Sequence, residues 1–258
     1  MSRILLVLLL LAAAGCKDGG NSILDSYPFP EGKVFFTYPP IDFAGVQSFI
    51  GMGEPNVFPK DHGGFPLLHP YTLPANVLVM AMASGVIINV VPGTRTIPDW
   101  APASVKGRSY TDYGLNLKVS TTITVNYAHV TTLHPAILAK LGNLPADERG
   151  HEVAVPLAAG DTIGWVGPHA AMDFSVTDRS LRLSFLNPSR YEDLLRWAGH
   201  VFDYFQEPVL SRMLAITTRQ IPPRGGKVDY DVDGRIVGNW FLVGTTSYTQ
   251  WSRQLAIV

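Results

Sequence analysis

The sequence predicts a mainly β fold, a sandwich or barrel, followed by a C-terminal helical segment and a β-hairpin. The chain has 24 Gly and 20 Pro among 258 residues, more than a helical bundle tolerates, because both residues interrupt helices and mark turns. Between these turns, short stretches alternate apolar and polar residues, which is the pattern of half-buried strands. An apolar fraction of 47% supplies a core, and a charged fraction of 16% is too low for a disordered chain.

Charge and cysteine content exclude several classes of function. A net charge of −1 lacks the clustered basic residues that phosphate contacts need, so no nucleic-acid partner is expected. A single Cys excludes a disulfide framework and a Cys-rich zinc site. The chain also has no Gly-x-Ser-x-Gly elbow, Gly-rich phosphate loop or dinucleotide fingerprint.

Residues 1–15 are predicted to be a signal peptide. A basic Arg3 precedes the apolar run Ile4–Ala14, which is too short to span a bilayer, since a spanning helix needs about 20 residues. The run Ala13-Ala14-Gly15-Cys16 resembles the lipobox of bacterial lipoproteins, which implies that Cys16 is lipidated and becomes the first residue. The expected partner is then the membrane, and the expected location is the periplasmic or outer-membrane face of the bacterial envelope. The alternative is a plain signal peptide with an incidental Cys.

The rest of the chain divides into three predicted parts. Residues 16–45 contain the lipidated Cys and a tether, which begins with the polar stretch Lys17–Ser26. Residues 46–186 form the β domain. Residues 187–258 form an appendage made of the helical segment and the hairpin.

Within the β domain, the apolar patterns predict a succession of short strands. Val77–Val91 is expected to form two strands joined at Ser84-Gly85. The alternating pattern then predicts further strands at Leu115–Val119, Thr121–Tyr127, Val153–Val155, Thr162–Val166 and Met172–Val176.

In the appendage, apolar residues recur at helical intervals and no longer alternate as they do in strands. Asn187-Pro188 is a typical helix start, and apolar residues then recur at helical intervals from Tyr191 to Phe205, a face expected to dock on the β domain. Pro208 interrupts this helix, and a second short helix follows it. Residues 226–242 are expected to form a hairpin that turns at Asp233-Gly234. A calcium loop at its aspartates is disfavoured, because no bidentate Glu closes a loop of about 12 residues.

Four stretches, taken in order, resemble the LytM-type zinc metallopeptidases of peptidase family M23. Their order and spacing over residues 58–178 carry the resemblance. It implies a LytM-like fold of the duplicated-hybrid-motif kind, a zinc cofactor and hydrolysis of peptide cross-links in peptidoglycan. The stretches are Met80–Ile87 (the family's apolar-Ala…Gly-Val), Asp112–Leu117 leading to Tyr127–Val130 (Gly-x-x-Val-x-Ile, then Tyr-x-His-Leu), Ala159–Gly167 (Gly-x-x-Ile-Gly-x-x-Gly) and Met172–Val176 (Leu-His-Phe-Glu-Val).

The chain departs from the family at the catalytic positions. The resemblance implies zinc ligands from a His-x-x-x-Asp motif and from the second His of His-x-His. Pro66 lies four residues after His62, and Asp173 and Ala171 stand at the second and first His positions. His129 is the one catalytic position of the family that is retained.

The residues that remain still form a chemically sound zinc set. Zinc accepts carboxylate oxygen as well as imidazole nitrogen, and a catalytic site needs three protein ligands and a water. The candidate metal ligands are His62, Asp61 and Asp173, with His129 and His69 as alternatives to Asp61. His129 and His169 are the catalytic candidates, as a general base or as a group that stabilises the tetrahedral oxyanion.

Structural alternatives exist for these residues. Asp61-His62 is also consistent with a turn in which Asp caps the backbone, and His169 with an exposed loop residue. Asp173 lies between two apolar strand residues and therefore faces either solvent or a site.

The sequence also leaves two alternative functions for the protein as a whole. The first is a LytM-like binding or regulatory lipoprotein without catalysis, and the second is a β scaffold that binds a carbohydrate or another small ligand.

Overall fold

The computed structural model describes residues 24, 27–53, 60–246 and 254–257, and it is mainly β. The predicted signal peptide and Cys16 lie outside the described residues. No helix in the described part of the chain is long and apolar enough to cross a membrane.

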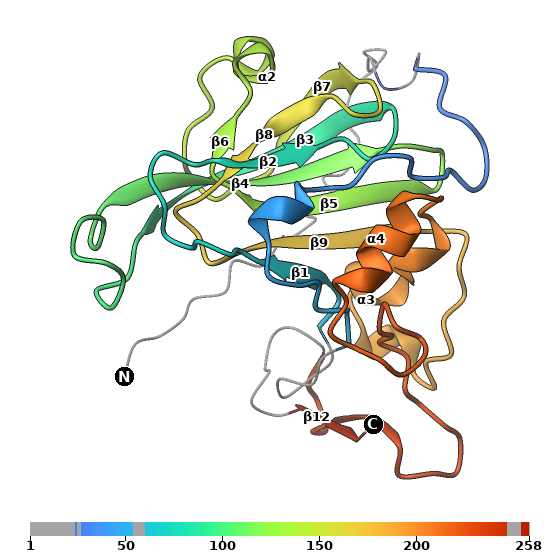
Figure 1. The fold of residues 1–258 in the computed structure, drawn as a ribbon. Coiled ribbons are helices and arrows are strands. Elements are labelled where there is room, and N and C mark those ends of the chain that lie inside the picture. Colours follow the sequence, from blue (N-terminus) through green and yellow to red (C-terminus); the bar gives the residue numbers. More distant parts are fainter. Residues whose placement is uncertain (1–23, 25–26, 54–59, 247–253, 258) are drawn as a thin grey trace.

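The larger sheet has seven strands, all paired in antiparallel fashion (Figure 1). Six of them follow the order β1-β9-β5-β4-β3-β7, and β10 pairs with β9 beyond the end of β1. A second sheet has the order β2-β8-β6, and β11 pairs with β12. The strands are β1 (Gly63–Pro66), β2 (Val77–Met80), β3 (Gly85–Thr96), β4 (Ser109–Lys118), β5 (Ile123–Val130), β6 (Thr132–Leu133), β7 (His151–Leu157), β8 (Thr162–Val166), β9 (Ala171–Asp178), β10 (Ala198–Gly199), β11 (Gly238–Phe241) and β12 (Gln254–Ile257).

The strand predictions for the β domain are confirmed. β2 and β3 are separated by residues 81–84, with Gly85 as the first residue of β3, and Thr162–Val166 forms a strand with the predicted bounds. The addition of a side chain at Gly85 would place its Cβ 2.3 Å from the Lys118 carbonyl oxygen, so only Gly allows β3 and β4 to approach so closely at this point. His134 caps α2 (Pro135–Leu141), because its side chain accepts a hydrogen bond from the Ala136 amide.

The two faces of the larger sheet differ in polarity. Leu117 on β4, Tyr127 on β5 and Phe174 on β9 belong to the buried core on one face. The other face carries Asn126 and Ser175, joined by a hydrogen bond of 3.1 Å. Because side chains alternate along a strand, Asp173 lies on this polar face and not in the core.

The predicted tether is too long at its C-terminal end. Phe36 and Ile41 are fully buried in the main core, and Ile41 forms a β-bridge with Val79. Asp42 then caps the short helix η1 (Phe43–Gly45). The folded body therefore begins before residue 46, because these apolar side chains complete the core of the β sheets.

The predicted helix from Asn187 to Phe205 is wrong, although the docking of its apolar face is confirmed. The segment contains η2 (Pro188–Arg190), α3 (Asp193–Arg196), β10, η3 (Val201–Asp203) and, after Pro208, the expected short helix α4 (Val209–Ala215). Gly199 favours an extended backbone over a helix and pairs with Val176, which adds a strand to the free edge of β9. Tyr204 and Phe205 are buried against Phe36 in the main core.

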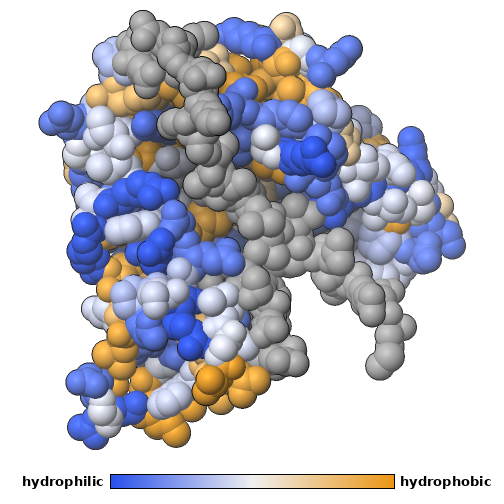
Figure 2. Space-filling model, turned by 180° about the vertical axis from the view of Figure 1, so that it is seen from behind, coloured by the Kyte–Doolittle hydropathy of each residue, from blue (hydrophilic) through white to orange (hydrophobic). Residues whose placement is uncertain are grey.

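The C-terminal hairpin has the predicted turn but a different partner strand. Asp233 and Gly234 form the turn, yet β11 pairs with β12 and not with residues 226–232. Asp231 accepts hydrogen bonds from the amides of Leu186 and Asn239. The segment around Asp231 is therefore fixed by its side chain and not by the backbone hydrogen bonds of strand pairing. Seen from behind, apolar surface gathers at the end of the molecule that carries these strands, where Trp240 and Leu255 are exposed (Figure 2).

Candidate functional site

Two histidines approach Asp173 from the strands on either side of it. Asp173 lies on β9, which pairs with both β1 and β5. Its register partners are Gly64 on β1 and Ala128 on β5, so His62, which directly precedes β1, and His129, on β5, both lie close to it. The antiparallel register thus brings together three residues that are far apart in the sequence.

The two imidazole rings lie near the same carboxylate oxygen of Asp173. The Nε2 atoms of His62 and His129 each lie 3.4 Å from the Oδ2 atom of Asp173. This distance is longer than most charge-assisted hydrogen bonds. It is close to the separation of two ligands on one tetrahedral zinc ion, about 3.4 Å for bonds of about 2.0–2.1 Å.

The second ring nitrogen of each histidine is held by another carboxylate. His62 Nδ1 lies 2.6 Å from Asp61 Oδ1, and His129 Nδ1 lies 3.0 Å from Asp112 Oδ2. Such a carboxylate fixes the orientation of the imidazole and leaves Nε2 available for a ligand. Asp112 in turn accepts a hydrogen bond from Arg95 Nε at 3.3 Å.

His169 completes the cluster by stacking on His129. The two rings are nearly parallel, 8° apart, and their centroids are separated by 3.7 Å. His169 Nδ1 lies 2.9 Å from the Ala171 carbonyl oxygen and 3.3 Å from the Ala171 amide nitrogen. The shorter contact is to an acceptor, which favours a proton on Nδ1 and an unprotonated Nε2 in the neutral ring. His169 lies on the loop before β9, as one interpretation expected, but it is half-buried and not exposed.

The charges in this cluster determine which groups are protonated. Burial opposes the charge on His129, but hydrogen bonds to Asp112 and Asp173 raise its pKa from 6.5 to about 10. Burial opposes the charge on Asp173 as well, yet His129 and His62 hold the pKa of its carboxyl well below the usual range. Burial and the neighbouring charge of His129 lower the pKa of His169 to about 4, so His169 is neutral at physiological pH.

Strained backbone borders the cluster. Among the described residues, the non-glycine residues with positive φ are Tyr71 (60°), His129 (68°) and Glu148 (61°). His129 is part of the cluster, and Glu148 pairs with Arg95 at 3.6 Å. Backbone strain of this kind persists where the surrounding structure enforces it, and it is frequent at functional sites.

The structure brings together all five residues predicted as metal ligands or catalytic groups. Asp61 is buried beside His62, and the remaining contacts join His62, His129, His169 and Asp173. The alternative ligand His69 is exposed on the loop after β1. The other histidines have local roles: His134 caps α2, His151 contacts Asp147, and His200 lies 2.8 Å from the Gly226 carbonyl oxygen.

Asp112 is the site residue that the sequence reasoning missed. It occurs in the quoted run before Tyr127–Val130, but a role for it required knowledge of the pairing of β4 with β5. The available signal was a carboxylate at the start of a strand run whose partner strand carries His129.

The donor set of this cluster fits zinc in chemistry, although the side chains contact one another directly. Among residues 24, 27–53, 60–246 and 254–257, no three His, Cys, Asp or Glu side chains already surround a common metal position. The fit is in the ligand types, two imidazoles and one carboxylate, and in the carboxylates that orient both imidazoles.

No family model matches this chain, and neither a curated protein nor a solved structure shows significant similarity to it.

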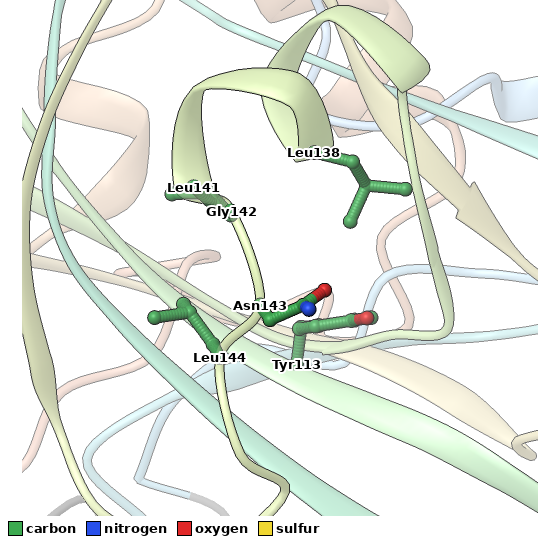
Figure 3. A pocket seen from close by; sticks show the side chains of 6 residues that line it. All are labelled: Tyr113, Leu138, Leu141, Gly142, Asn143 and Leu144. Atoms are coloured by element: carbon green, nitrogen blue, oxygen red, sulfur yellow. The ribbon is translucent and has the colours of Figure 1, made fainter.

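A separate small pocket lies away from this cluster. It has a volume of about 180 Å³, lies between Tyr113 of β4 and the C-terminal end of α2, and shares no residue with the site (Figure 3). It is lined by Tyr113, Leu138, Leu141, Gly142, Asn143 and Leu144.

Proposed function

We propose that the protein is a lipid-anchored, zinc-dependent hydrolase of peptide cross-links in the bacterial cell wall. His62, His129 and Asp173 are the proposed metal ligands. The compartment and the substrate rest on the lipobox-like segment and on the resemblance to LytM-type peptidases.

One observation carries this proposal. Two imidazole Nε2 atoms converge on one carboxylate oxygen at 3.4 Å each, while their Nδ1 atoms are held by Asp61 and Asp112. A cluster that served folding alone would not need two separately oriented imidazoles on a polar sheet face. The arrangement matches the way metal-binding histidines are positioned in proteins.

The chain's own residues have distinct roles in this proposal. A bound zinc ion would supply polarisation of the scissile carbonyl and a water with a pKa of about 7. His169, neutral and with Nδ1 held by Ala171, can accept a proton at Nε2 as the general base. Asp61 and Asp112 keep the two imidazoles in the orientation that ligation requires.

Metal analysis of residues 17–258 tests the proposal. We expect near-stoichiometric zinc in this soluble fragment and a large loss of zinc in Asp173→Ala and His62→Ala. His151→Ala is the matched control, because it removes a histidine outside the cluster, one whose ring contacts Asp147. Failure of the unmodified fragment to bind zinc after refolding with excess metal would rule the proposal out.

A second candidate is a LytM-like binding or regulatory lipoprotein without catalysis. The observation that favours it is the pairing of Pro66 with Ala171, directly opposite each other on β1 and β9. Neither residue can ligate a metal or transfer a proton, and both stand at positions that are functional in the family that the chain resembles. Full retention of wall binding by a fragment that holds no zinc would support this candidate.

A further inference from the structure

An aromatic platform at the surface is defined here as Tyr71, Trp100 and Tyr110. Tyr71 and Trp100 are in ring contact, and Tyr110 lies close enough to Tyr71 to interact with it electrostatically. Trp100 is 74% exposed and contacts Tyr71 edge to face, with ring centroids 4.9 Å apart and planes at 89°. An indole on the surface loses the hydrophobic stabilisation of burial, so a fixed and exposed Trp is a typical binding residue. The contact with Tyr71 holds the indole in place while most of its surface stays accessible.

The loop that carries Tyr71 is attached to the segment that carries His169. The Leu67 amide donates to the Ala170 carbonyl oxygen at 3.0 Å, and the Thr72 amide donates to the Gly167 carbonyl oxygen at 2.9 Å. These two bonds flank His169 in the sequence. The platform and the candidate site are therefore held by the same short stretch of backbone.

The other two platform residues belong to β4 and to the loop that joins β3 to β4. Tyr110 on β4 pairs with Arg95 on β3, and Arg95 contacts Asp112, which holds His129. The loop that carries Trp100 is closed at its base by a hydrogen bond from the Ile97 amide to the Arg108 carbonyl oxygen. The platform is thus connected to the candidate site through the loop before β9 and through strands β3 and β4.

We propose that this platform binds a sugar ring of a glycan strand next to the candidate site. The apolar C–H face of a hexose stacks on an exposed indole, and its hydroxyls require polar partners at the rim. Such partners are provided by Arg95 and Glu148, which pair with each other at 3.6 Å, and by the hydroxyl of Tyr110, the register partner of Arg95. The inference rests on the proposed function, because the peptide cross-links of a cell wall are carried on glycan strands.

Calorimetric titration of the full-length protein in a non-glycosidic detergent tests this inference. The probes are chitotetraose, an oligomer of N-acetylglucosamine, and a free wall stem tetrapeptide. We expect chitotetraose to bind the unmodified protein and Trp100→Ala to weaken binding roughly tenfold or more, as for the loss of a stacking aromatic. Trp100→Phe should retain part of the affinity.

Trp240→Ala is the matched control, because Trp240 is also exposed but lies on β11, away from the site. Equal chitotetraose affinity in Trp100→Ala and unmodified protein, no binding by the unmodified protein, or binding of the tetrapeptide alone would each overturn the inference. Zinc content is measured on the same samples. Sugar binding by protein that holds no zinc would rule out the proposed function but support sugar binding by the platform. Zinc binding without sugar binding would support the proposed function and overturn this inference.

Discussion

At the scale of single residues, His62 and His129 each divide their two ring nitrogens between two carboxylates. His129 contacts Asp173 through Nε2 and Asp112 through Nδ1, and His62 contacts Asp173 and Asp61 in the same way. The shared carboxylate is Asp173, and each histidine has an outer carboxylate of its own. Asp61 and Asp112 fix the orientation of the two imidazole rings through Nδ1. The Nε2 atoms, which lie near Asp173, are the atoms that can bind a metal.

Replacement of Asp112 should therefore weaken metal binding without removal of a ligand. Asp112→Asn keeps the size of the side chain but loses the charge that holds His129 Nδ1. We expect zinc affinity to fall roughly 10- to 100-fold, the usual effect of losing an orienting partner of a metal-bound histidine. Competition with a chromogenic chelator measures this affinity. Asp147→Asn is the control, because Asp147 contacts His151 outside the site, and an equal effect in both variants would contradict the assignment.

The stacked histidines predict how the stability of the metal-free protein depends on pH. The pKa of His129 is raised from 6.5 to about 10, so its stabilising contribution is full below pH 6.5 and is lost as pH rises towards 10. The pKa of His169 is lowered from 6.5 to about 4, so stability is also lost as pH falls from 6.5 towards 4. The free energy of unfolding should therefore reach its maximum near pH 6.5.

Urea unfolding in the presence of a chelator, repeated from pH 4 to pH 10, measures this profile. His129→Gln should flatten the alkaline side, and His169→Gln should flatten the acidic side. An unchanged alkaline side in His129→Gln would show that other groups cause the loss of stability there.

At the scale of elements, strands were predictable and their partners were not. The alternation of apolar residues defines a strand because it reflects one buried face, as in Thr162–Val166. Pairing depends on contacts across long sequence distances, so the partnership of β11 with β12 could not be derived from the turn at Asp233-Gly234. The helix expected up to Phe205 failed for the same reason, because Gly199 pairs with β9.

The site was partly predictable for related physical reasons. Asp173 was identifiable because a carboxylate between Met172 and Phe174 must face away from the core. The partnership of Asp112 with His129 was not, because the register of β4 and β5 shifts between Tyr113 and Leu115. The positive φ of His129, at 68°, turns its side chain in a direction that regular alternation does not predict.

The helical segment is attached to β9 by a buried hydrogen bond that can be tested alone. Tyr204 donates its hydroxyl proton to Asp178 Oδ2 at 2.8 Å, and Asp178 is only 4% exposed. Tyr204→Phe should lower the free energy of unfolding by about 1–3 kcal/mol, because it leaves a buried carboxylate oxygen without this donor. Urea denaturation measures the loss. Tyr38→Phe, which alters an exposed ring, should cost much less, and equal losses would show that the buried bond contributes little.

At the scale of the whole molecule, β9 separates the candidate site from the core that the helical segment completes. Asp173 faces the polar side of the sheet, whereas the next residue, Phe174, lies in the core beside Phe205, with ring centroids 6.3 Å apart. One strand thus positions both a site residue and a packing residue. Changes in the helical segment should therefore act on stability first and on the site only through β9.

The predicted attachment of this molecule to a membrane depends on one atom, the sulfur of Cys16. The chain has no other cysteine, and its apolar run Ile4–Ala14 is too short to span a bilayer. We expect cells that express the full chain to incorporate radiolabelled palmitate into it, and Cys16→Ser to abolish the incorporation completely. Ser26→Ala, in the predicted tether, is the control and should be labelled normally. Labelled Cys16→Ser protein would contradict the assignment, because lipid would then be attached elsewhere, and an unlabelled parent protein would favour a plain signal peptide.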